Sequence, residues 1–159
     1  MTRIGHGFDV HAFAPDRRLV LGGVEIPSEL GLLGHSDADV LTHALMDALL
    51  GAMRAEDIGV LFPDTDPAYE GADSLVLLAH VAALARERGF DIVDCDCTVA
   101  AQAPKLAPYR EQMRERMADA MGVPVERVGV KATTTERLGF VGRKEGIAAW
   151  AVCLLESDR

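Results

Sequence analysis

The sequence predicts an α/β protein of the α+β type, a small single domain with one mixed β-sheet and helices packed on one face. Stretches with apolar residues at every second position, as in strands, are interspersed with stretches of helical periodicity. The 159 residues are 49% hydrophobic but only 5% aromatic, which is typical of a globular chain with an aliphatic core. We expect one domain, residues 1–159, because no linker or internal repeat interrupts the pattern.

The N-terminal third begins with a strand and a hairpin. Arg3 to His11 is predicted to be a strand, and its Gly5 and Gly7 indicate that another segment approaches the backbone closely. Leu19 to Pro27 indicates a β-hairpin, because its central Gly-Gly pair supplies the positive φ angles of a two-residue turn. A helix is expected next, from about Asp37 to about Met53.

This predicted helix carries polar residues in a regular pattern. Ser36 is a preferred N-cap residue, so the helix is expected to begin just after it. Asp39, His43 and Asp47 recur every four residues and therefore line up opposite the broad apolar face. We expect His43 to lie off the core face, on a polar stripe that suits a metal ion, a substrate or another subunit.

Helices and strands alternate through the rest of the chain. Residues 56–72, rich in Gly, Pro and Asp, are predicted to form a long loop, and long loops are usually functional or mobile. The following elements are expected to be a helix from Ser74 to Arg88, a strand from Asp91 to Gln102, a helix from about Pro108 to Met121, a strand from Val128 to Thr133 and a last strand from about Ile147 to Leu155.

Charge and composition exclude several classes of protein. The net charge of −9, without a cluster of basic residues, argues against nucleic-acid binding. No stretch approaches the roughly 18 apolar residues of a membrane span, and the first residues lack the apolar core of a secretion signal. We therefore expect a mature chain that begins here, in a bacterial cytoplasm, with no membrane partner.

The cysteines and two of the histidines are expected to be structural. Cys95, Cys97 and Cys153 form an odd set in a chain without export features, so we predict reduced thiols and no disulfide. Cys95 and Cys97 face the apolar side of a predicted strand and are expected in the core. His6, between two glycines, and His80, in an apolar helix, are also interpreted as structural.

Asp9, His11 and His43 form a candidate metal site. Asp9 and His11 are two residues apart on a predicted strand and therefore share a face, while His43 could complete the set from a helix. Two imidazoles and one carboxylate suit Zn²⁺ with an open fourth position, as in sites where the metal polarises a substrate. The alternative is that these are unrelated polar surface residues, because Asp-x-His is a common pattern.

Three further stretches could bind a substrate. Lys131 to Glu136 places three threonine hydroxyls at a strand end, where they suit phosphate oxygens, and Glu136 could hold Mg²⁺; the alternative is a Thr-rich strand edge. Asp57 to Gly59 and Phe62 to Asp66 could bind the hydroxyls of a polyol, or could simply form turns. Arg143 and Glu145 could form an ion pair or an anion site.

Taken together, these stretches resemble the 2-C-methyl-D-erythritol 2,4-cyclodiphosphate synthase family. The likeness covers Arg3 to Leu155 in order and is carried by Arg3 to His11, Leu33 to Leu50, Asp57 to Gly59, Leu61 to Pro67, Ala101 to Lys105 and Val130 to Gly146. The resemblance implies a homotrimer with active sites at subunit interfaces. It also implies a lyase-type reaction of the non-mevalonate isoprenoid pathway, in which 4-diphosphocytidyl-2-C-methyl-D-erythritol 2-phosphate cyclises to the 2,4-cyclodiphosphate and releases CMP.

The resemblance also implies roles for individual residues. Asp9, His11 and His43 would be zinc ligands, with one ion per subunit, and Glu136 would help to hold Mg²⁺ or Mn²⁺ between the two phosphates of the diphosphate. His35 and Thr134 would be catalytic, as stabilisers of the transition state. The erythritol and its phosphates would contact Asp9, Val10, His11, His35, Ser36, Asp57, Ile58, Gly59, Phe62, Pro63, Asp64, Thr65 and Asp66. The cytidine and phosphate wall, supplied partly by the neighbouring subunit, would comprise Ala101, Gln102, Ala103, Pro104, Lys105, Leu106, Ala107, Thr133, Thr134, Thr135, Glu136, Phe140 and Arg143.

Two other functions remain open at this point. A metal-dependent phosphohydrolase would use water in place of the internal phosphate and would give a linear product. A binding module would use Phe8, Arg143 and Glu145 around the trimer axis to bind an isoprenoid diphosphate in a central cavity.

Overall fold

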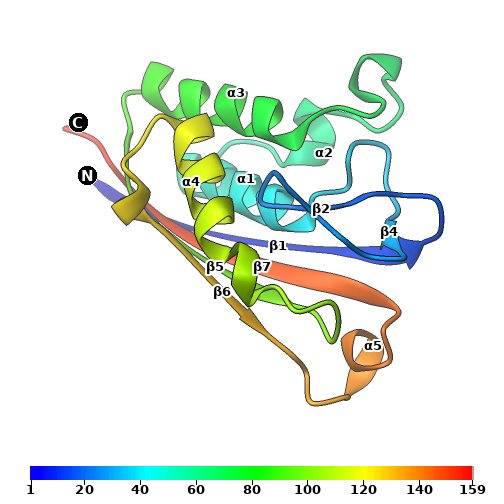
Figure 1. Ribbon diagram of the computed structural model, residues 1–159. Coiled ribbons are helices and arrows are strands. Elements are labelled where there is room, and N and C mark those ends of the chain that lie inside the picture. Colours follow the sequence, from blue (N-terminus) through cyan, green and yellow to red (C-terminus); the bar gives the residue numbers. More distant parts are fainter. Residues whose placement is uncertain (159) are drawn as a thin grey trace.

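A five-stranded mixed sheet with the strand order β4-β1-β7-β5-β6 forms the base of the structure, a computed structural model that describes residues 1–158 (Figure 1). Neighbouring strands are antiparallel except β5 and β6, which are parallel, so the predicted mixed sheet is confirmed. The strands are β1 (Thr2–Ala14), β4 (Gly31–Leu32), β5 (Asp91–Ala100), β6 (Val128–Thr133) and β7 (Gly146–Glu156). The predicted hairpin is also present, as β2 (Leu19–Leu21) and β3 (Val24–Ile26).

The three long helices lie together on one face of the sheet, as predicted (Figure 1). They are α1 (Val40–Met53), α3 (Ser74–Glu87) and α4 (Arg110–Met121). Helix α1 packs directly on β1 and β7, α3 covers α1, and α4 packs on β6 and against α3. The shorter elements are α2 (Ile58–Leu61), α5 (Gly139–Gly142) and 3₁₀ turns at Pro67–Tyr69, Ala107–Tyr109 and Val125–Arg127. None of the described helices is long and apolar enough to cross a membrane.

The two glycines of β1 allow α1 to lie against the strand backbone. A Cβ atom at Gly5 would lie 1.9 Å from the carbonyl oxygen of Ala48, and one at Gly7 would lie 1.9 Å from that of Ala44. Real Cβ atoms never approach a backbone oxygen so closely. The segment that the sequence predicted to approach this strand is therefore helix α1, and its closeness brings His43 over β1.

Helix α1 begins three residues later than predicted, and its N-cap is Asp39 rather than Ser36. Ala38 has a φ of 57°, which is incompatible with a right-handed helix, so the helix cannot include it. The Asp39 side chain accepts the backbone N–H of Thr42 at 3.0 Å. The fully buried Asp39 carboxylate also accepts the N–H groups of Gly22 and Gly23 in the hairpin turn, at 2.9 and 2.7 Å. Asp39 is therefore a buried tie between hairpin and helix, which periodicity along the helix cannot reveal.

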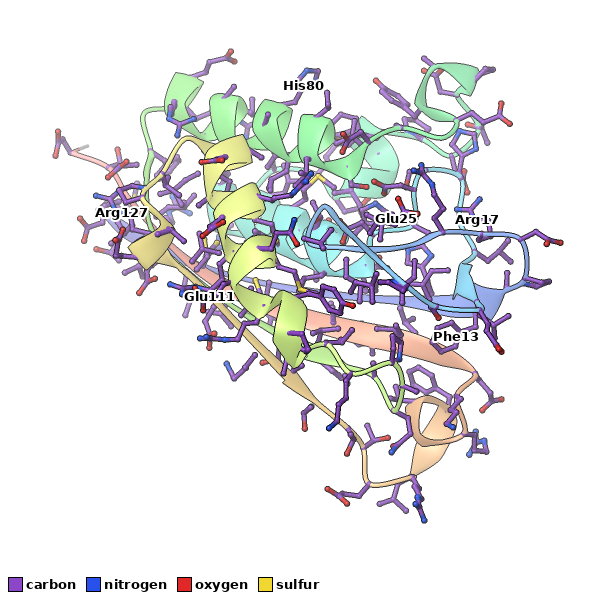
Figure 2. The ribbon with its side chains drawn as sticks, viewed as in Figure 1. Phe13, Arg17, Glu25, His80, Glu111 and Arg127 are labelled. Carbon is purple, nitrogen blue, oxygen red and sulfur yellow. The ribbon has the colours of Figure 1, made fainter. Side chains whose placement is uncertain are left out.

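Other expectations need correction. The predicted polar stripe of α1 is only partly exposed: Asp39 is fully buried, His43 is only 8% exposed beneath the start of α3, and Asp47 is half-buried. The predicted loop of residues 56–72 contains α2, and the strand expected to reach Gln102 ends at Ala100. His6 and His80 are exposed rather than structural, and Figure 2 shows His80 pointing outward from α3. Cys95 and Cys97 are buried free thiols, as predicted, and so is Cys153.

Candidate metal centre and active site

Asp9 and His11 of β1 meet His43 of α1 where the helix crosses the strand. The Oδ2 atom of Asp9 lies 3.0 Å from Nε2 of His11 and 3.2 Å from Nδ1 of His43, and the two ring nitrogens are 3.3 Å apart. Within residues 1–158, this is the one group of three or more His, Cys, Asp or Glu side chains with ligand atoms close enough to share an ion. The expected convergence of strand and helix side chains is therefore present.

Hydrogen bonds on the far side of each ring orient both histidines. Nδ1 of His11 lies 2.7 Å from the carbonyl oxygen of Leu33, which can only accept, so Nδ1 carries a proton and Nε2 is the atom through which His11 would bind a metal ion. Nε2 of His43 lies 2.9 Å from Oγ of Ser74 and 3.2 Å from Oγ of Ser36. Two imidazole nitrogens and a carboxylate oxygen thus face one point, with the outer hydrogen bonds typical of zinc-binding histidines.

The electrostatics of the group lower the pKa of Asp9 and raise the pKa of His11. Burial alone would raise the pKa of Asp9, but hydrogen bonds and charge from His11 and His43 outweigh it and lower the pKa to about 2. Burial lowers the pKa of His11, but the hydrogen bond and charge of Asp9 outweigh it and raise the pKa above 6.5. Ionised Asp9 therefore stabilises the fold above pH 3.8 and ceases to do so as the pH falls through about 2. Protonated His11 stabilises it below pH 6.5 and ceases to do so as the pH rises through its raised pKa.

We expect the Zn²⁺ affinity of the metal-free protein to increase with pH between about pH 5.5 and pH 8, because binding must displace the His11 proton. Competition with a chromophoric chelator at several pH values, corrected for the chelator's own protonation, measures this affinity. An affinity that stays constant over the whole interval would contradict the assignment of His11 as a ligand.

The three side chains open onto a cavity of about 400 Å³. The residues lining it are Asp9, His11, Leu33, Gly34, His35, Ser36, His43, Met46, Ile58, Gly59, Phe62, Asp64, Tyr69 and Leu77. The structure thus brings His35, Ser36, Ile58, Gly59, Phe62 and Asp64 to the candidate metal site. Nε2 of His35 lies 3.0 Å from the carbonyl oxygen of Asp66, so His35 also contacts the segment 62–69, in which Phe62, Asp64 and Tyr69 line the cavity.

Five other residues expected at this site do not line the cavity. The Val10 side chain is exposed on the opposite face of the sheet. Asp57 caps α2, with Oδ1 3.1 Å from the N–H of Val60, and lines a separate hollow beside His6 and Asp47. Pro63, Thr65 and Asp66 lie in the segment 62–69 but do not line the cavity. Asp66 caps the 3₁₀ turn that follows it, because its Oδ1 accepts the N–H of Ala68.

The predicted nucleotide wall lies elsewhere in the subunit. Asp9 pairs with Ala149, Ala149 with Val99, and Val99 with Ala132, so these residues form one row across the sheet. Three strand spacings separate the ends of the row, which places Ala132, next to Thr133, about 14 Å from Asp9. Within one chain, Thr133, Thr134, Thr135 and Glu136 therefore do not meet the three candidate ligands.

The wall residues nevertheless gather beyond the ends of β5 and β6. The amide oxygen of Gln102 accepts the N–H of Arg137 at 3.1 Å, and Thr134 Oγ1 accepts the N–H of Glu136 at 3.2 Å. Leu106 and Ala107 line a hollow of about 230 Å³, and Ala103 and Pro104 line another of about 320 Å³. Ala101 is buried, whereas Lys105 and Phe140 are exposed. Arg143 forms an exposed ion pair with Glu145, with Nε 2.7 Å from Oε2.

Glu136 is one of six described residues other than glycine with a positive φ. Its φ of 54° and that of Arg137, 63°, lie in the left-handed region, which is uncommon for residues other than glycine. Such conformations cluster at functional sites. Ser74, Asp37 and Leu33, which support the candidate ligands from behind, could not be predicted, because nothing in local sequence spacing connects them to His11 or His43.

Comparisons with known proteins agree over the whole chain. The model of the YgbB family matches residues 2–156. The 2-C-methyl-D-erythritol 2,4-cyclodiphosphate synthase of Geotalea uraniireducens is 62% identical over 154 residues, which are 97% of this chain and 98% of that protein. Among solved structures, the bifunctional IspDF of Campylobacter jejuni is 45% identical with a TM-score of 0.95, over 99% of this chain and 42% of that longer one. IspF of Plasmodium falciparum, solved as a CDP complex, is 32% identical with a TM-score of 0.87, over 99% of this chain and 97% of that one.

The structural matches extend over the sheet and all three long helices, because they cover 99% of the chain. The resemblance inferred from the sequence motifs is thereby confirmed. The chain belongs to the YgbB family, the family of 2-C-methyl-D-erythritol 2,4-cyclodiphosphate synthases.

Proposed function

We propose that this chain is a lyase-type enzyme that converts 4-diphosphocytidyl-2-C-methyl-D-erythritol 2-phosphate into 2-C-methyl-D-erythritol 2,4-cyclodiphosphate and releases CMP. The observation that carries the proposal is the convergence of Asp9, His11 and His43 on a cavity, in a chain 62% identical to a synthase of this name. Two curated relatives, of Geotalea uraniireducens and Thiobacillus denitrificans, are 62% and 60% identical and come from bacteria, which supports a bacterial cytoplasm as the setting. Incubation with the substrate should release CMP; a protein that releases none would contradict the proposal.

Asp9, His11 and His43 would hold one Zn²⁺ per subunit, and Glu136 would help to hold Mg²⁺ or Mn²⁺. When bound, such ions polarise phosphoryl oxygens and neutralise charge as it develops on the leaving group. The protein's own residues position the reacting groups. Ile58, Gly59, Phe62 and Asp64 would enclose the erythritol, because they line the cavity beside the candidate ligands. His35 and Ser36, which line the same cavity, would lie against the diphosphate.

We further propose a homotrimer in which each active site lies between two subunits. The sheet face opposite the helices exposes Ile4, Phe8 and Val10 on β1 and Trp150 and Val152 on β7. Phe8 and Trp150 are paired across the two strands, with ring centroids 5.3 Å apart. Adjacent exposed apolar side chains of this kind are typical of an interface, and the interface would bring a neighbour's nucleotide wall to the cavity.

The two halves of the proposed site have complementary chemistry. The cavity half supplies the three candidate ligands, His35 and the erythritol contacts. The other half supplies Ala101 to Ala107, which would hold the cytidine, and Thr133 to Glu136, which would hold the phosphates and the second ion. A CDP complex is among the related structures, in IspF of Plasmodium falciparum, and this supports a cytidine nucleotide as the ligand of the wall.

Replacing Thr134 with alanine is expected to lower kcat by about 10- to 100-fold with little change in KM, since the hydroxyl is proposed to act on the transition state. Steady-state CMP release measures both constants. Thr2→Ala, at an exposed position where β1 begins, is the matched control and should leave both constants unchanged. A higher KM with an unchanged kcat would show that Thr134 contributes only to binding and would refute its catalytic role.

An isoprenoid diphosphate is a second ligand, which the sheet face opposite the helices could accommodate. In a trimer, the apolar Phe8 and Trp150 would face the axis, and Arg143 could exchange its exposed partner Glu145 for a diphosphate. Titration calorimetry with farnesyl diphosphate should give a weaker affinity for Arg143→Ala than for the wild type. Arg18→Ala, which removes another exposed Arg–Glu pair on the hairpin, is the control. Equal affinities for Arg143→Ala and the wild type would dismiss this ligand site.

A further inference from the structure

Ser74 contacts His43 from the side opposite to the candidate metal. It is the first residue of α3, its side chain is completely buried, and its Oγ lies 2.9 Å from Nε2 of His43. The same hydroxyl is hydrogen-bonded to the Asp37 carboxylate. Asp73 already caps α3 through the N–H of Leu75, so the Ser74 hydroxyl is not needed to begin the helix.

The hydrogen-bonding capacity of these groups fixes the direction of each bond. Asp37 accepts three hydrogen bonds, from the N–H of Ser74 at 3.0 Å, the N–H of Asp39 at 3.1 Å and the hydroxyl of Ser74. A serine hydroxyl has one proton, and an ionised carboxylate can only accept. The Ser74 proton therefore goes to Asp37, and its oxygen must accept from Nε2 of His43. Nε2 then carries a proton, which leaves Nδ1, the nitrogen that faces Asp9 and His11, as the atom through which His43 would bind a metal ion.

Ser36 does not impose the same direction. Its Oγ is 3.2 Å from Nε2 of His43 and accepts the N–H of Ala38 at 3.2 Å. No carboxylate among the described residues takes the Ser36 proton, so this hydroxyl can donate to Nε2 or accept from it. Of the two hydroxyls at Nε2, only that of Ser74, with Asp37 behind it, has a fixed direction and requires a proton on Nε2.

We propose that Ser74 and Asp37 are positioning residues that hold His43 in its metal-binding tautomer through the relay Asp37–Ser74–His43. This inference rests on the proposed metal centre, because it explains how His43 becomes a ligand. The backbone fixes the relay as well: the N–H of Asp37 donates to the carbonyl of Ala72 at 3.1 Å, and the N–H of Gly71 donates to that of His35 at 2.8 Å. These two bonds hold the residues just before α3 against the loop that carries His35 and Asp37.

Two measurements on the metal-free, full-length protein test the relay. Chelator competition gives the Zn²⁺ affinity, and two-dimensional ¹⁵N–¹H spectra of the imidazoles give the tautomer of His43. Ser74→Ala is expected to weaken Zn²⁺ binding by about 10- to 100-fold and to give a mixture of the two His43 tautomers. Ser74→Thr keeps the hydroxyl and should restore both the affinity and the Nε2–H tautomer.

Asp73→Ala is the matched control for any loosening of α3, because it removes the N-cap of the same helix without touching His43. It is expected to lower the melting temperature and to leave the Zn²⁺ affinity and the tautomer unchanged. Asp37→Asn, which weakens the acceptor but keeps its shape, should show the Ser74→Ala effects in smaller measure and serves if Ser74→Ala does not fold.

The results separate the relay from the metal centre itself. If Ser74→Ala binds Zn²⁺ as tightly as the wild type and its His43 tautomer is unchanged, the relay is overturned and the metal centre stands. A wild-type protein that does not bind Zn²⁺ would overturn both. If Asp73→Ala weakens Zn²⁺ binding as much as Ser74→Ala does, the effect comes from a loosened α3, and the relay is again overturned.

Discussion

Replacing His43 with alanine is expected to remove the catalytic metal and to lower kcat by about 100- to 10,000-fold, since a Lewis acid supplies several kcal/mol of transition-state stabilisation and each 1.4 kcal/mol is tenfold in rate. His43 supplies one of three ligand atoms, and the other two come from the neighbouring strand. Two remaining ligands hold zinc poorly, because catalytic zinc sites use three protein ligands. Metal analysis of the purified variant and steady-state CMP release measure the two losses.

His80→Ala is the matched control for this experiment, because it makes the same chemical change at an exposed position on α3 (Figure 2). It should keep both metal and activity. Circular dichroism should show that both variants remain folded, since alanine is a favourable residue inside a helix. Full activity of His43→Ala in protein shown to be free of zinc would rule out a catalytic role for this site.

Mixing two inactive variants is expected to restore activity if each active site is shared between subunits. His43→Ala removes the metal half of the site, and Glu136→Ala removes the phosphate half. In mixed trimers with equal amounts of each, a site is intact when one subunit supplies His43 and its neighbour supplies Glu136. Random assembly makes about a quarter of the sites intact, so about a quarter of the wild-type activity should return.

The control for this mixture uses two variants of the same half. His43→Ala and Asp9→Ala both damage the candidate metal site of one chain, so no arrangement of the two gives an intact set of ligands. This mixture should stay inactive. Absence of recovery in the His43→Ala and Glu136→Ala mixture, with mixed trimers verified by native mass spectrometry, would contradict a site built from two subunits.

Local sequence patterns predicted those parts of the fold that depend on neighbouring residues. The two-residue spacing of Asp9 and His11 placed both on one face of a strand, and the Gly-Gly pair at Gly22 predicted the hairpin turn. Gly5 and Gly7 predicted a close backbone neighbour, which proved to be α1. The resemblance to a family then connected His43 to the first two ligands, which spacing alone could not do.

The errors arose where distant segments decide the structure. Asp39 reads as part of a polar stripe, yet the hairpin N–H groups of Gly22 and Gly23 draw it into the core as a cap. His43 reads as lying off the core, but α3, which begins thirty-one residues later at Ser74, covers it. The Ser74 hydroxyl could not be recognised as its partner, because a helix start predicts a cap and not a hydrogen bond to another helix.

The most direct test of the proposed cyclisation is phosphorus NMR of the product formed by the purified protein. Attack of the internal phosphate predicts CMP and a second product whose two phosphorus atoms are joined through oxygen and therefore show mutual coupling. Attack by water would instead give CMP and a linear bisphosphate with two uncoupled monoester signals. A coupled pair is the result that this account predicts, and two uncoupled monoester signals would contradict it.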